Sequence, residues 1–300
     1  MACLKLGADL SHVFTTKAAA AVIRTYSPDL LVHSSFVDSC ECAPEQLQGS
    51  GREALVQAGC AEVEAWFSRL DCLVLGPGLG RDPLLLDIGQ NLVEAARKVG
   101  LPLVLDGDGL LLAARAPEVV RGYSTCVMTP NLNEFRRLSV TLGVSLHGPN
   151  SDRLSKLRDV TQLLAGPVLL SKGPTDAIHD GQHPVLCSAS GGLRRCRGQG
   201  DILSGAVAVF VCWTRAFITR ARAGHDTAAL LDMNPMMLAA FGASLITRGA
   251  CHQAFSLKQR AMLAGDVMEQ LGGALEALMQ SQAGPGPTPR AGTAFKPLDS

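Results

Sequence analysis

Short apolar runs alternate with longer stretches of helical periodicity along most of this chain. Residues 103–105, 126–128 and 168–170 are apolar throughout, which is typical of short buried strands. Residues 84–99, before the first of these runs, and residues 152–164, before the last, carry apolar side chains every three or four positions, as amphipathic helices do. Strands of this kind separated by helices indicate a parallel sheet with helices on both faces. The pattern therefore predicts an α/β fold with a mainly parallel central sheet.

The same reading predicts elements before and after this region. Further strands are expected at 10–14, 30–33 and 72–75, and further helices at 16–26, 53–70, 202–213, 236–255 and 266–278, with a loop at 38–52. Asp180-Gly181 is a favoured hairpin turn, so two short strands are expected within 176–187. Residues 219–235 are polar and Arg-rich and are expected to form a surface excursion. Residues 1–280 are predicted to form one domain, and the Pro-, Gly- and Thr-rich stretch 281–300 a disordered tail.

Composition removes several classes of function. Lys plus Arg and Asp plus Glu both number 27, so no excess charge favours a nucleic acid or a membrane as partner. We find no apolar run of the ~20 residues that span a bilayer, and no secretory signal or transit peptide at the start of the chain. The ten cysteines include no CxxC pair and favour reduced thiols, so we expect a cytoplasmic or mitochondrial protein.

Polar and glycine residues follow several of the predicted strands directly. The strand predicted at 72–75 is followed by Gly76-Pro77-Gly78-Leu79-Gly80. The strand at 103–105 is followed by Asp106 and Asp108, and the strand at 168–170 by Lys172-Gly173. Ligands of parallel α/β sheets bind at the carboxyl ends of the strands, where these residues are expected to meet. The glycine run alone is a weak signal, and Asp108 is equally well explained as a helix cap or as a ligand for a metal or a sugar hydroxyl.

Asn131 and Glu134 lie three residues apart at the start of a predicted helix. An amide and a carboxylate there are suited to a hydrated magnesium ion, which uses few protein oxygens. The alternative is a capping pair in which Glu134 reaches back to the helix start. Lys172 has two explanations as well, since a lysine at a strand end neutralises a phosphate or simply lies in solvent.

The segment Arg194-Arg195-Cys196-Arg197-Gly198-Gln199-Gly200-Asp201 precedes a long apolar run. A glycine-bearing turn that opens a helix directs unpaired N–H groups at one point, where the helix dipole also favours negative charge. Asp201 is then a carboxylate beside an anion site, suited to act as a base on a hydroxyl next to a phosphate. An ordinary turn with Asp201 as helix cap explains these residues equally well.

Taken in order, five segments resemble one family. Residues 76–82, 106–110, 129–135, 172–176 and 194–201 are similar to the motifs of the ATP-dependent NAD(P)H-hydrate dehydratases, repair enzymes with a ribokinase-like fold, and the similarity runs from about residue 4 to 278. The resemblance implies a ribokinase-like three-layer α/β/α sandwich. It also implies that ATP phosphorylates the hydroxyl of the hydrated nicotinamide ring of (S)-NADHX or NADPHX, after which loss of phosphate restores NADH or NADPH.

The resemblance also assigns roles to individual residues. Asp201 corresponds to the catalytic base and also contacts the hydrate. The other implied substrate-binding residues are Gly78, Asn131, Leu132, Asn133, Glu134, Phe135, Arg136 and Arg137. The implied ATP-binding residues are Lys172, Gly173, Pro174, Thr175, Asp176, Gly191, Gly192, Leu193, Arg194, Arg195, Cys196, Arg197, Gly198, Gln199 and Gly200. Asn131 and Glu134 match the pair that organises Mg²⁺ through water, so NADHX or NADPHX, ATP and Mg²⁺ are the expected partners.

The sequence departs from the family pattern at a few positions. Arg197 stands where the family usually has glycine, Gly107 where it has alanine, and Leu132 where it has histidine. The family also begins with a strand and a Gly-rich segment that this sequence does not contain, so we expect an N-terminally incomplete domain. Two alternatives remain open: a shortened, catalytically impaired form, and a ribokinase-like kinase of a vitamin-type alcohol. A homo-oligomer is one assembly that the sequence leaves open.

Overall fold

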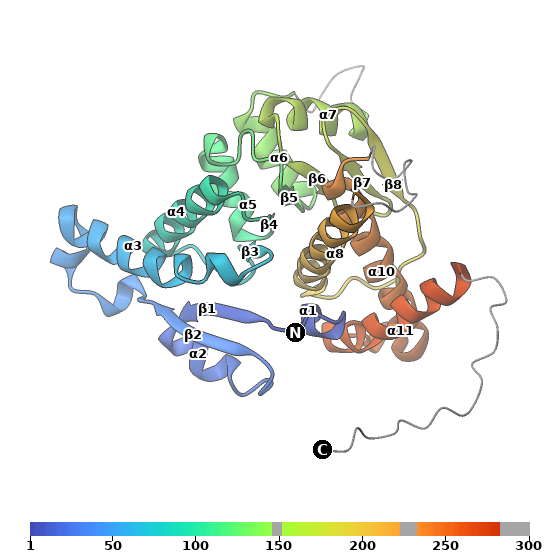
Figure 1. Cartoon of the computed structure of the whole chain (residues 1–300), viewed down its shortest axis with the longest axis horizontal. Helices are drawn as coiled ribbons and strands as arrows, with labels where there is room; N and C mark the ends of the chain where they lie inside the picture. Colours follow the sequence, from blue (N-terminus) through green and yellow to red (C-terminus); the bar gives the residue numbers. More distant parts are fainter. Residues whose placement is uncertain (146–151, 223–232, 283–300) are drawn as a thin grey trace.

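A six-stranded sheet forms the centre of the protein, in the order β3-β4-β5-β6-β7-β8 (Figure 1). The computed structural model describes residues 1–145, 152–222 and 233–282. The strands are β3 (Leu73–Leu75), β4 (Leu103–Leu105), β5 (Cys126–Met128), β6 (Val168–Ser171), β7 (Asp176–His179) and β8 (Pro184–Cys187). Strands β3 to β6 pair in parallel, and β7 and β8 add an antiparallel hairpin at one edge. The mainly parallel sheet expected from the apolar runs is therefore confirmed.

Side chains of the strands β3 to β7 alternate between two separate cores. Leu103 and Leu105 of β4 face one core, whereas Val104 between them faces the other. All three are fully buried, so β4 has apolar neighbours on both faces. This explains why the central strands read as continuous apolar runs rather than as alternating ones.

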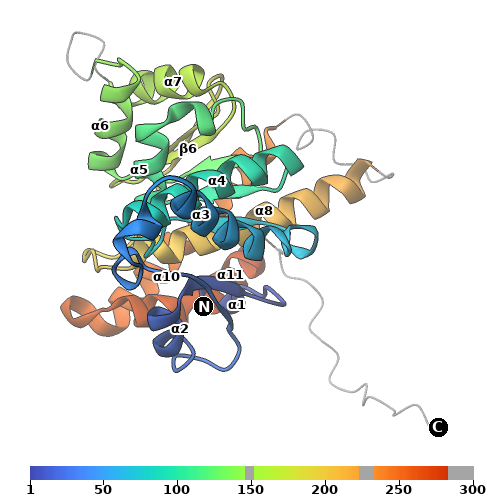
Figure 2. The same ribbon diagram turned by 90° about the vertical axis from the view of Figure 1, so that its left-hand side faces the viewer.

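Helices cover both faces of the sheet. The first core lies beneath α3 (Gly49–Glu64), α4 (Pro83–Val99), α5 (Asp108–Arg115), α6 (Leu132–Thr141) and α7 (Arg153–Leu164). Helices α3 and α4 pack on each other on this side (Figure 2). The second core lies beneath α1 (Ala2–Lys5), α8 (Gln199–Arg222), α10 (Pro235–Lys258) and α11 (Ala264–Gln282). The result is the predicted three-layer α/β/α sandwich.

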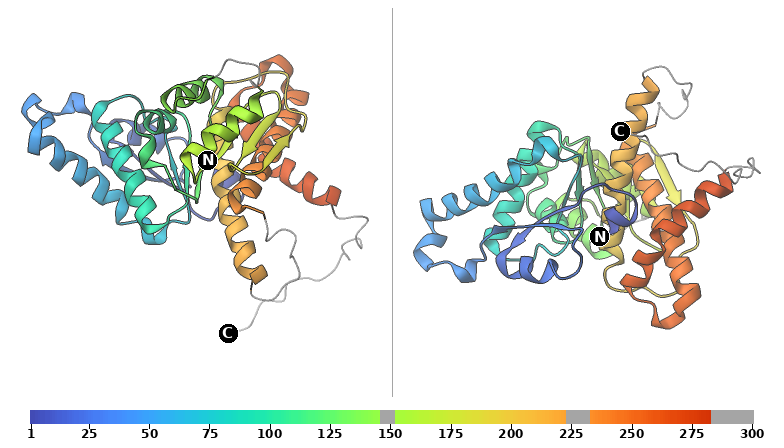
Figure 3. Two further views of the ribbon diagram at one scale, coloured as in Figure 1. Left: turned by 90° about the horizontal axis from the view of Figure 1, so that it is seen from above. Right: turned by 60° about the horizontal axis from the view of Figure 1, so that its bottom comes forward.

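The N-terminal strands form a sheet of their own. Strands β1 (His12–Thr16) and β2 (Leu31–Phe36) pair in parallel and are joined by α2 (Lys17–Ile23). Strand β2 packs against α3, whereas α1 at the N-terminus packs against α8 and α11 (Figure 3). The chain therefore contacts helices of both layers before it enters the central sheet.

Several boundaries differ from those predicted. The predicted loop 38–52 contains two short 3₁₀ helices and the start of α3 at Gly49. In the second 3₁₀ helix, Pro44 is the first residue, and the Gln46 side chain accepts from the Ala43 N–H at 2.9 Å. The 3₁₀ segments are Ser39–Glu41, Pro44–Leu47, Phe67–Arg69, Pro117–Val119 and Gln259–Ala261. Helix α8 extends to Arg222, and residues 223–232 of the predicted excursion lie outside the described residues. Helix α11 ends at Gln282, and 283–300 of the predicted tail are likewise not described.

Helices α8 and α10 pack extensively on each other in the second layer. A Cβ at Gly242 of α10 would lie 2.5 Å from the ring of Phe210 on α8, so the glycine permits this approach without interrupting the helix. Within the described residues, α8 alone is long and apolar enough over 199–221 to cross a membrane, and half of that window is buried inside the protein. Its first turn points at the carboxyl ends of the central strands, which places the segment that precedes it at the functional edge of the sheet.

Candidate active site

An ion pair links the ends of two central strands. Lys172, directly after β6, places its Nζ 2.6 Å from Oδ1 of Asp106, which directly follows β4. The Asp106 side chain is 3% exposed and that of Lys172 is 20% exposed, so water screens this pair only weakly. A Cβ at Gly200 would lie 3.4 Å from both Asp106 Oδ2 and Lys172 Nζ. The first turn of α8 therefore contacts the pair directly.

Asp201 lies in the same turn, where charges of both signs act on it. Residue 201 is exposed to solvent. The pKa of Asp201 is nevertheless raised, first because neighbouring atoms remove part of its water shell and second because Asp106 repels its charge, while Lys172 and Arg197 act in the opposite direction. A carboxylate with a raised pKa is a stronger proton acceptor than an ordinary aspartate.

The backbone before Asp201 presents free donors toward this point. The first hydrogen bond of α8 runs from the Ile202 N–H to the Gly198 carbonyl at 3.1 Å. The N–H groups of Gln199, Gly200 and Asp201 precede that bond, so they lie at the positive end of the helix dipole. The turn reaches this geometry through Gly198, whose φ of 93° is one that other residues rarely adopt. These are the groups that the predicted anion cradle would use.

Arg197 fits the cradle without backbone strain. In the described part of the chain, Ala165 and Gln259 are the non-glycine residues with positive φ, so Arg197 has an ordinary conformation. Its guanidinium acts on Asp201 electrostatically. Arg197 thus adds a positive charge beside Asp201 without a backbone conformation that would require glycine.

Asn131 and Glu134 form a complete capping box at the start of α6. Asn131 Oδ1 accepts from the N–H groups of Asn133 and Glu134 at 2.9 and 3.1 Å, and Glu134 Oε2 accepts from the Asn131 N–H at 2.7 Å. Burial raises the pKa of Glu134, and Asp106 adds to this effect, against the hydrogen bond from Asn131 and the charges of Lys172 and Arg137. Both side chains therefore have a structural role, and Glu134 also lies within electrostatic reach of the Lys172–Asp106 pair.

The loops that follow β3 and β4 are in close contact at Gly76. Gly76 has a φ of 120°, and a Cβ there would lie 1.8 Å from the Asp106 carbonyl oxygen. The Gly80 N–H donates to Asp108 Oδ2 at 3.1 Å, so Asp108 joins the loop after β3 to the start of α5. Gly78 between them is exposed, with no atom within 4 Å of its Cβ position, which leaves room for a ligand beside it.

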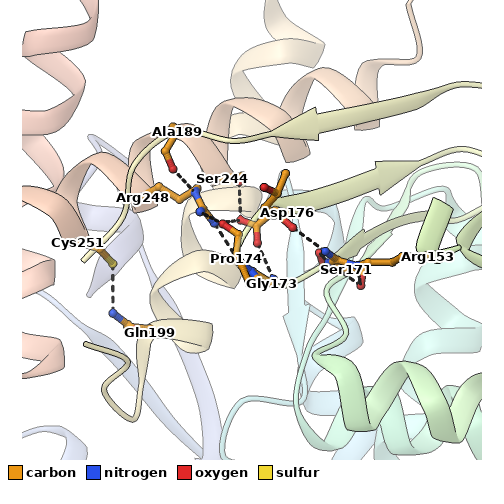
Figure 4. Close-up of polar contacts among 11 residues, drawn as sticks. Arg153, Ser171, Gly173, Pro174, Asp176, Ala189, Gln199, Ser244, Arg248 and Cys251 are labelled. Carbon is orange, nitrogen blue, oxygen red and sulfur yellow. Dashed lines mark hydrogen bonds and ion pairs between the residues drawn. The ribbon is translucent and has the colours of Figure 1, made fainter. Parts of the chain in front are cut away.

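The segment Lys172–Asp176 is held by two arginines and a buried carboxylate (Figure 4). Asp176 Oδ1 accepts from the Gly173 N–H at 2.9 Å, and its Oδ2 accepts from the Ser244 hydroxyl at 2.7 Å. Arg153 of α7 donates from Nη1 to the Thr175 carbonyl at 2.6 Å and from Nη2 to the Ser171 carbonyl. Arg248 of α10 donates to the Gly173 and Pro174 carbonyls from the other side. The turn is thereby fixed from both layers of the sandwich.

Most of the predicted residues lie on one edge of the sheet. Glu134 and Asp201 act electrostatically with Lys172 and Asp106, and the cradle residues precede Asp201 directly. Leu132, Asn133, Arg136, Arg137, Leu193, Arg195 and Arg197 are exposed, whereas Phe135 and Cys196 are buried. Phe135 is 4% exposed and packs in the first core, so its side chain supports α6 and does not reach a ligand.

Three residues that support the site gave no sequence signal. Ser244, Arg248 and Cys251 of α10 contact the predicted nucleotide segments, and Cys251 Sγ accepts from Gln199 Nε2 at 3.3 Å. They lie in an apolar helix more than forty positions after the cradle, and their spacing of four and three residues resembles that of any helix face. Arg153, at the start of α7, was equally inconspicuous.

A family model, a curated relative and a solved structure that resemble this chain share one description. The family model described as NAD(P)H-hydrate dehydratase matches residues 1–272. The ATP-dependent (S)-NAD(P)H-hydrate dehydratase of Physcomitrium patens is 38% identical over 292 residues, covering 93% of this chain and 84% of that protein. A ribokinase-like superfamily protein from Enterococcus faecalis has a similar fold, with a TM-score of 0.63 at 19% identity over 92% of this chain and 80% of that one. A Bacillus subtilis ADP/ATP-dependent NAD(P)H-hydrate dehydratase, co-crystallised with ATP/Mg²⁺ and soaked with CoA, gives 0.57 at 14% identity over 92% and 84%.

Proposed function

The chain belongs to the NAD(P)H-hydrate dehydratase family, and we propose from this that it uses ATP to dehydrate (S)-NADHX and (S)-NADPHX, restoring NADH and NADPH. The position of Asp201 is the observation that supports the proposal most directly. Asp201 lies at the start of α8, beside unpaired N–H groups and the Lys172–Asp106 pair. A proton acceptor next to an anion site is the arrangement that phosphoryl transfer to a hydroxyl requires.

Asp201 is assigned the role of the base. Its carboxylate accepts the proton of the ring hydroxyl as the hydroxyl oxygen attacks the γ-phosphorus of ATP, and ADP leaves. The raised pKa of Asp201 favours this transfer, since the carboxylate holds the proton more tightly than an ordinary aspartate does. The N–H groups of Gln199, Gly200 and Asp201 face the transferring phosphoryl group and stabilise the charge on its oxygens.

The second half of the reaction needs little from the protein. A hydroxyl is a poor leaving group, whereas its phosphate ester leaves readily. The ring nitrogen supplies the electron pair as the C–O bond breaks, and loss of a ring proton then restores the dihydronicotinamide. Lys172, still paired with Asp106, offers positive charge to the departing phosphate. In this scheme the exposed Asn133, Arg136 and Arg137 bind the hydrate.

Magnesium fits this edge of the sheet as a water-bound ion. Asn131 Oδ1 and Glu134 Oε2 are engaged in the capping box, which leaves the second Glu134 oxygen for a water of the ion. No group of three or more His, Cys, Asp or Glu in the described residues could hold a metal directly. Mg²⁺ usually keeps several waters and binds substrate phosphates. We therefore assign Glu134, held in place by the N–H group of Asn131, to orienting Mg²⁺ that enters with ATP, where the ion would neutralise phosphate charge.

The experiment is a coupled product analysis on the purified chain. (S)-NADHX, ATP and Mg²⁺ should yield NADH absorbance, ADP and inorganic phosphate in equal amounts. A stable phosphorylated product without phosphate release would instead indicate a kinase of a small alcohol. Binding of ATP with no NADH formed, under conditions where a full-length relative is active, would indicate a catalytically impaired form.

The cysteines and the charge balance bear on the compartment and the partners. The ten cysteines are unpaired in the structure and several are buried, which suits a reducing compartment such as the cytoplasm or the mitochondrion. The balanced charge continues to favour small molecules over nucleic acid or membrane as partners. A homo-oligomer stays a prediction that a light-scattering mass would test.

A further inference from the structure

One face of α10 contacts every predicted nucleotide-binding segment. Ser244, Arg248 and Cys251 are spaced by four and three residues, so they lie along one side of the helix. Ser244 and Arg248 contact the segment 172–176, and Cys251 contacts Gln199 of the cradle. A Cβ at Gly192 would lie 2.9 Å from the Cys251 carbonyl oxygen, so the backbone at Gly192 packs on the same helix.

Arg248 makes the most contacts of this face. Its Nε donates to the Ala189 carbonyl at 2.6 Å, its Nη1 to the Gly173 carbonyl at 3.2 Å, and its Nη2 to the Pro174 carbonyl. Nη1 also lies 3.2 Å from Asp176 Oδ2. One planar group therefore joins the turn after β6 to the chain that leaves β8 (Figure 4). The side chain is 16% exposed, so it is fixed in place and not free in solvent.

The carbonyl oxygens satisfy the donors of the guanidinium group, and Asp176 balances its charge. Arginine carries five donors in a rigid fork, and each of its three nitrogens meets an acceptor here. A lysine would offer one flexible ammonium and would not span the two segments with the same geometry. Ser244, one turn earlier, donates to the oxygen of Asp176 that faces Arg248, and so fixes the carboxylate that completes the link.

We infer that Arg248 is a positioning residue for ATP, which fixes the segment 172–176 relative to residues 189–200 so that both reach the nucleotide at once. The inference rests on the proposed function for the identity of the nucleotide. Arg248 itself is not required to touch ATP or the reacting atoms. Its loss should therefore weaken ATP binding while the chemical step, which depends on Asp201 and the start of α8, proceeds once ATP is bound.

The test compares Arg248→Met and Arg248→Lys with wild type, using steady-state kinetics and calorimetric titration of ATP. We expect the KM and Kd for ATP to rise about tenfold in Arg248→Met, the size expected for loss of a charge-assisted hydrogen-bond set, with kcat and the KM for NADHX within about twofold. Arg248→Lys should recover part of the ATP affinity. Arg52→Met removes an arginine with a 2.6 Å ion pair to Asp87 between α3 and α4, and should leave all four constants unchanged.

Ser244→Ala provides a milder variant if Arg248→Met does not fold. It deletes one hydroxyl and should raise the Kd for ATP by about two- to fivefold, again with little change in kcat. Unchanged ATP affinity in folded Arg248→Met or in Ser244→Ala would overturn the inference, as would a fall in kcat with the Kd unchanged. Calorimetry of ATP alone separates this outcome from failure of the proposed function, which would appear as absence of NADH formation by wild type.

Discussion

The character of Asp201 depends on three charged side chains from different elements. Asp106 at the end of β4 raises the pKa of its carboxyl, and Lys172 at the end of β6 and Arg197 in the cradle lower it, in addition to the larger effect of lost hydration. A base acts in its deprotonated form, so activity should fall as the pH drops through a pKa that lies above that of an ordinary aspartate. Substitutions at Asp201 and at Asp106 test the ionisation of the Asp201 carboxyl group.

Replacing Asp201 with asparagine should remove turnover and keep nucleotide binding. The amide has the shape of the carboxylate but accepts no proton at working pH, so kcat should fall by about 10²- to 10⁴-fold. The Kd for ATP should stay within a few-fold of wild type. The melting temperature should not decrease, because the variant lacks a charge whose hydration the folded state reduces. Substantial turnover in Asp201→Asn would reject the residue as the base.

Asp106→Asn should shift the acidic limb of the kcat/KM profile to lower pH. The change removes the negative charge that raises the pKa of Asp201 and releases Lys172 to act on Asp201 more strongly; both effects lower that pKa. Asp87→Asn is the matched control, since Asp87 also forms a 2.6 Å ion pair but lies on α4 with Arg52 as partner. An acidic limb that stays in place, or moves to higher pH, in Asp106→Asn would contradict the assignment.

The strand ends could be predicted from the sequence, whereas the packing of the helices could not. Runs of three apolar residues closed by Gly, Asp or Asn mark β4 and β5 at their observed bounds. The end of α8 was missed because its later turns are largely exposed at Arg215, Ala216 and Phe217, so the apolar signal fades while the helix continues. The role of α10 could not be predicted for another reason. The contacts of Arg248 with residues 173–174 and 189 exist only after folding has brought these distant segments together.

Gly76→Ala tests how tightly the loops after β3 and β4 are interlocked. The added Cβ would lie 1.8 Å from the Asp106 carbonyl oxygen at a φ of 120°, so the variant should lose about 3 kcal/mol or more of unfolding free energy. Gly80→Ala is the control, since its φ of 81° is also unfavourable but no atom lies within 4 Å of the new Cβ. That control should lose about 1 kcal/mol. Equal losses in denaturant titrations would mean that the loops separate easily.

At the scale of the whole molecule, the described residues form two sheets with no strand pairing between them. The residues assigned to ATP lie in or beside the segments that follow β6 and β8 of the six-stranded sheet, whereas β1, β2 and α2 form a separate parallel unit. The residue pattern predicted both sets of strands. It could not predict that their hydrogen bonding is separate, because strand pairing depends on which edges meet in space and not on the sequence of either edge.

This division predicts where ATP should protect the backbone from hydrogen exchange. A ligand that binds only the native state lowers the population of open states in the parts it connects, by about 2.7 kcal/mol at a hundredfold excess over Kd. Slower exchange is therefore expected at 172–176, at 189–201 and in α10 around Ser244 to Cys251, which are joined through Arg248 and Gln199. Residues 12–36 should exchange at an unchanged rate. Lys172→Met is the control: it should bind ATP more weakly and lose this protection. Equal protection of β1 and β2 in wild type would contradict the prediction, because the two sheets would then respond to ATP together.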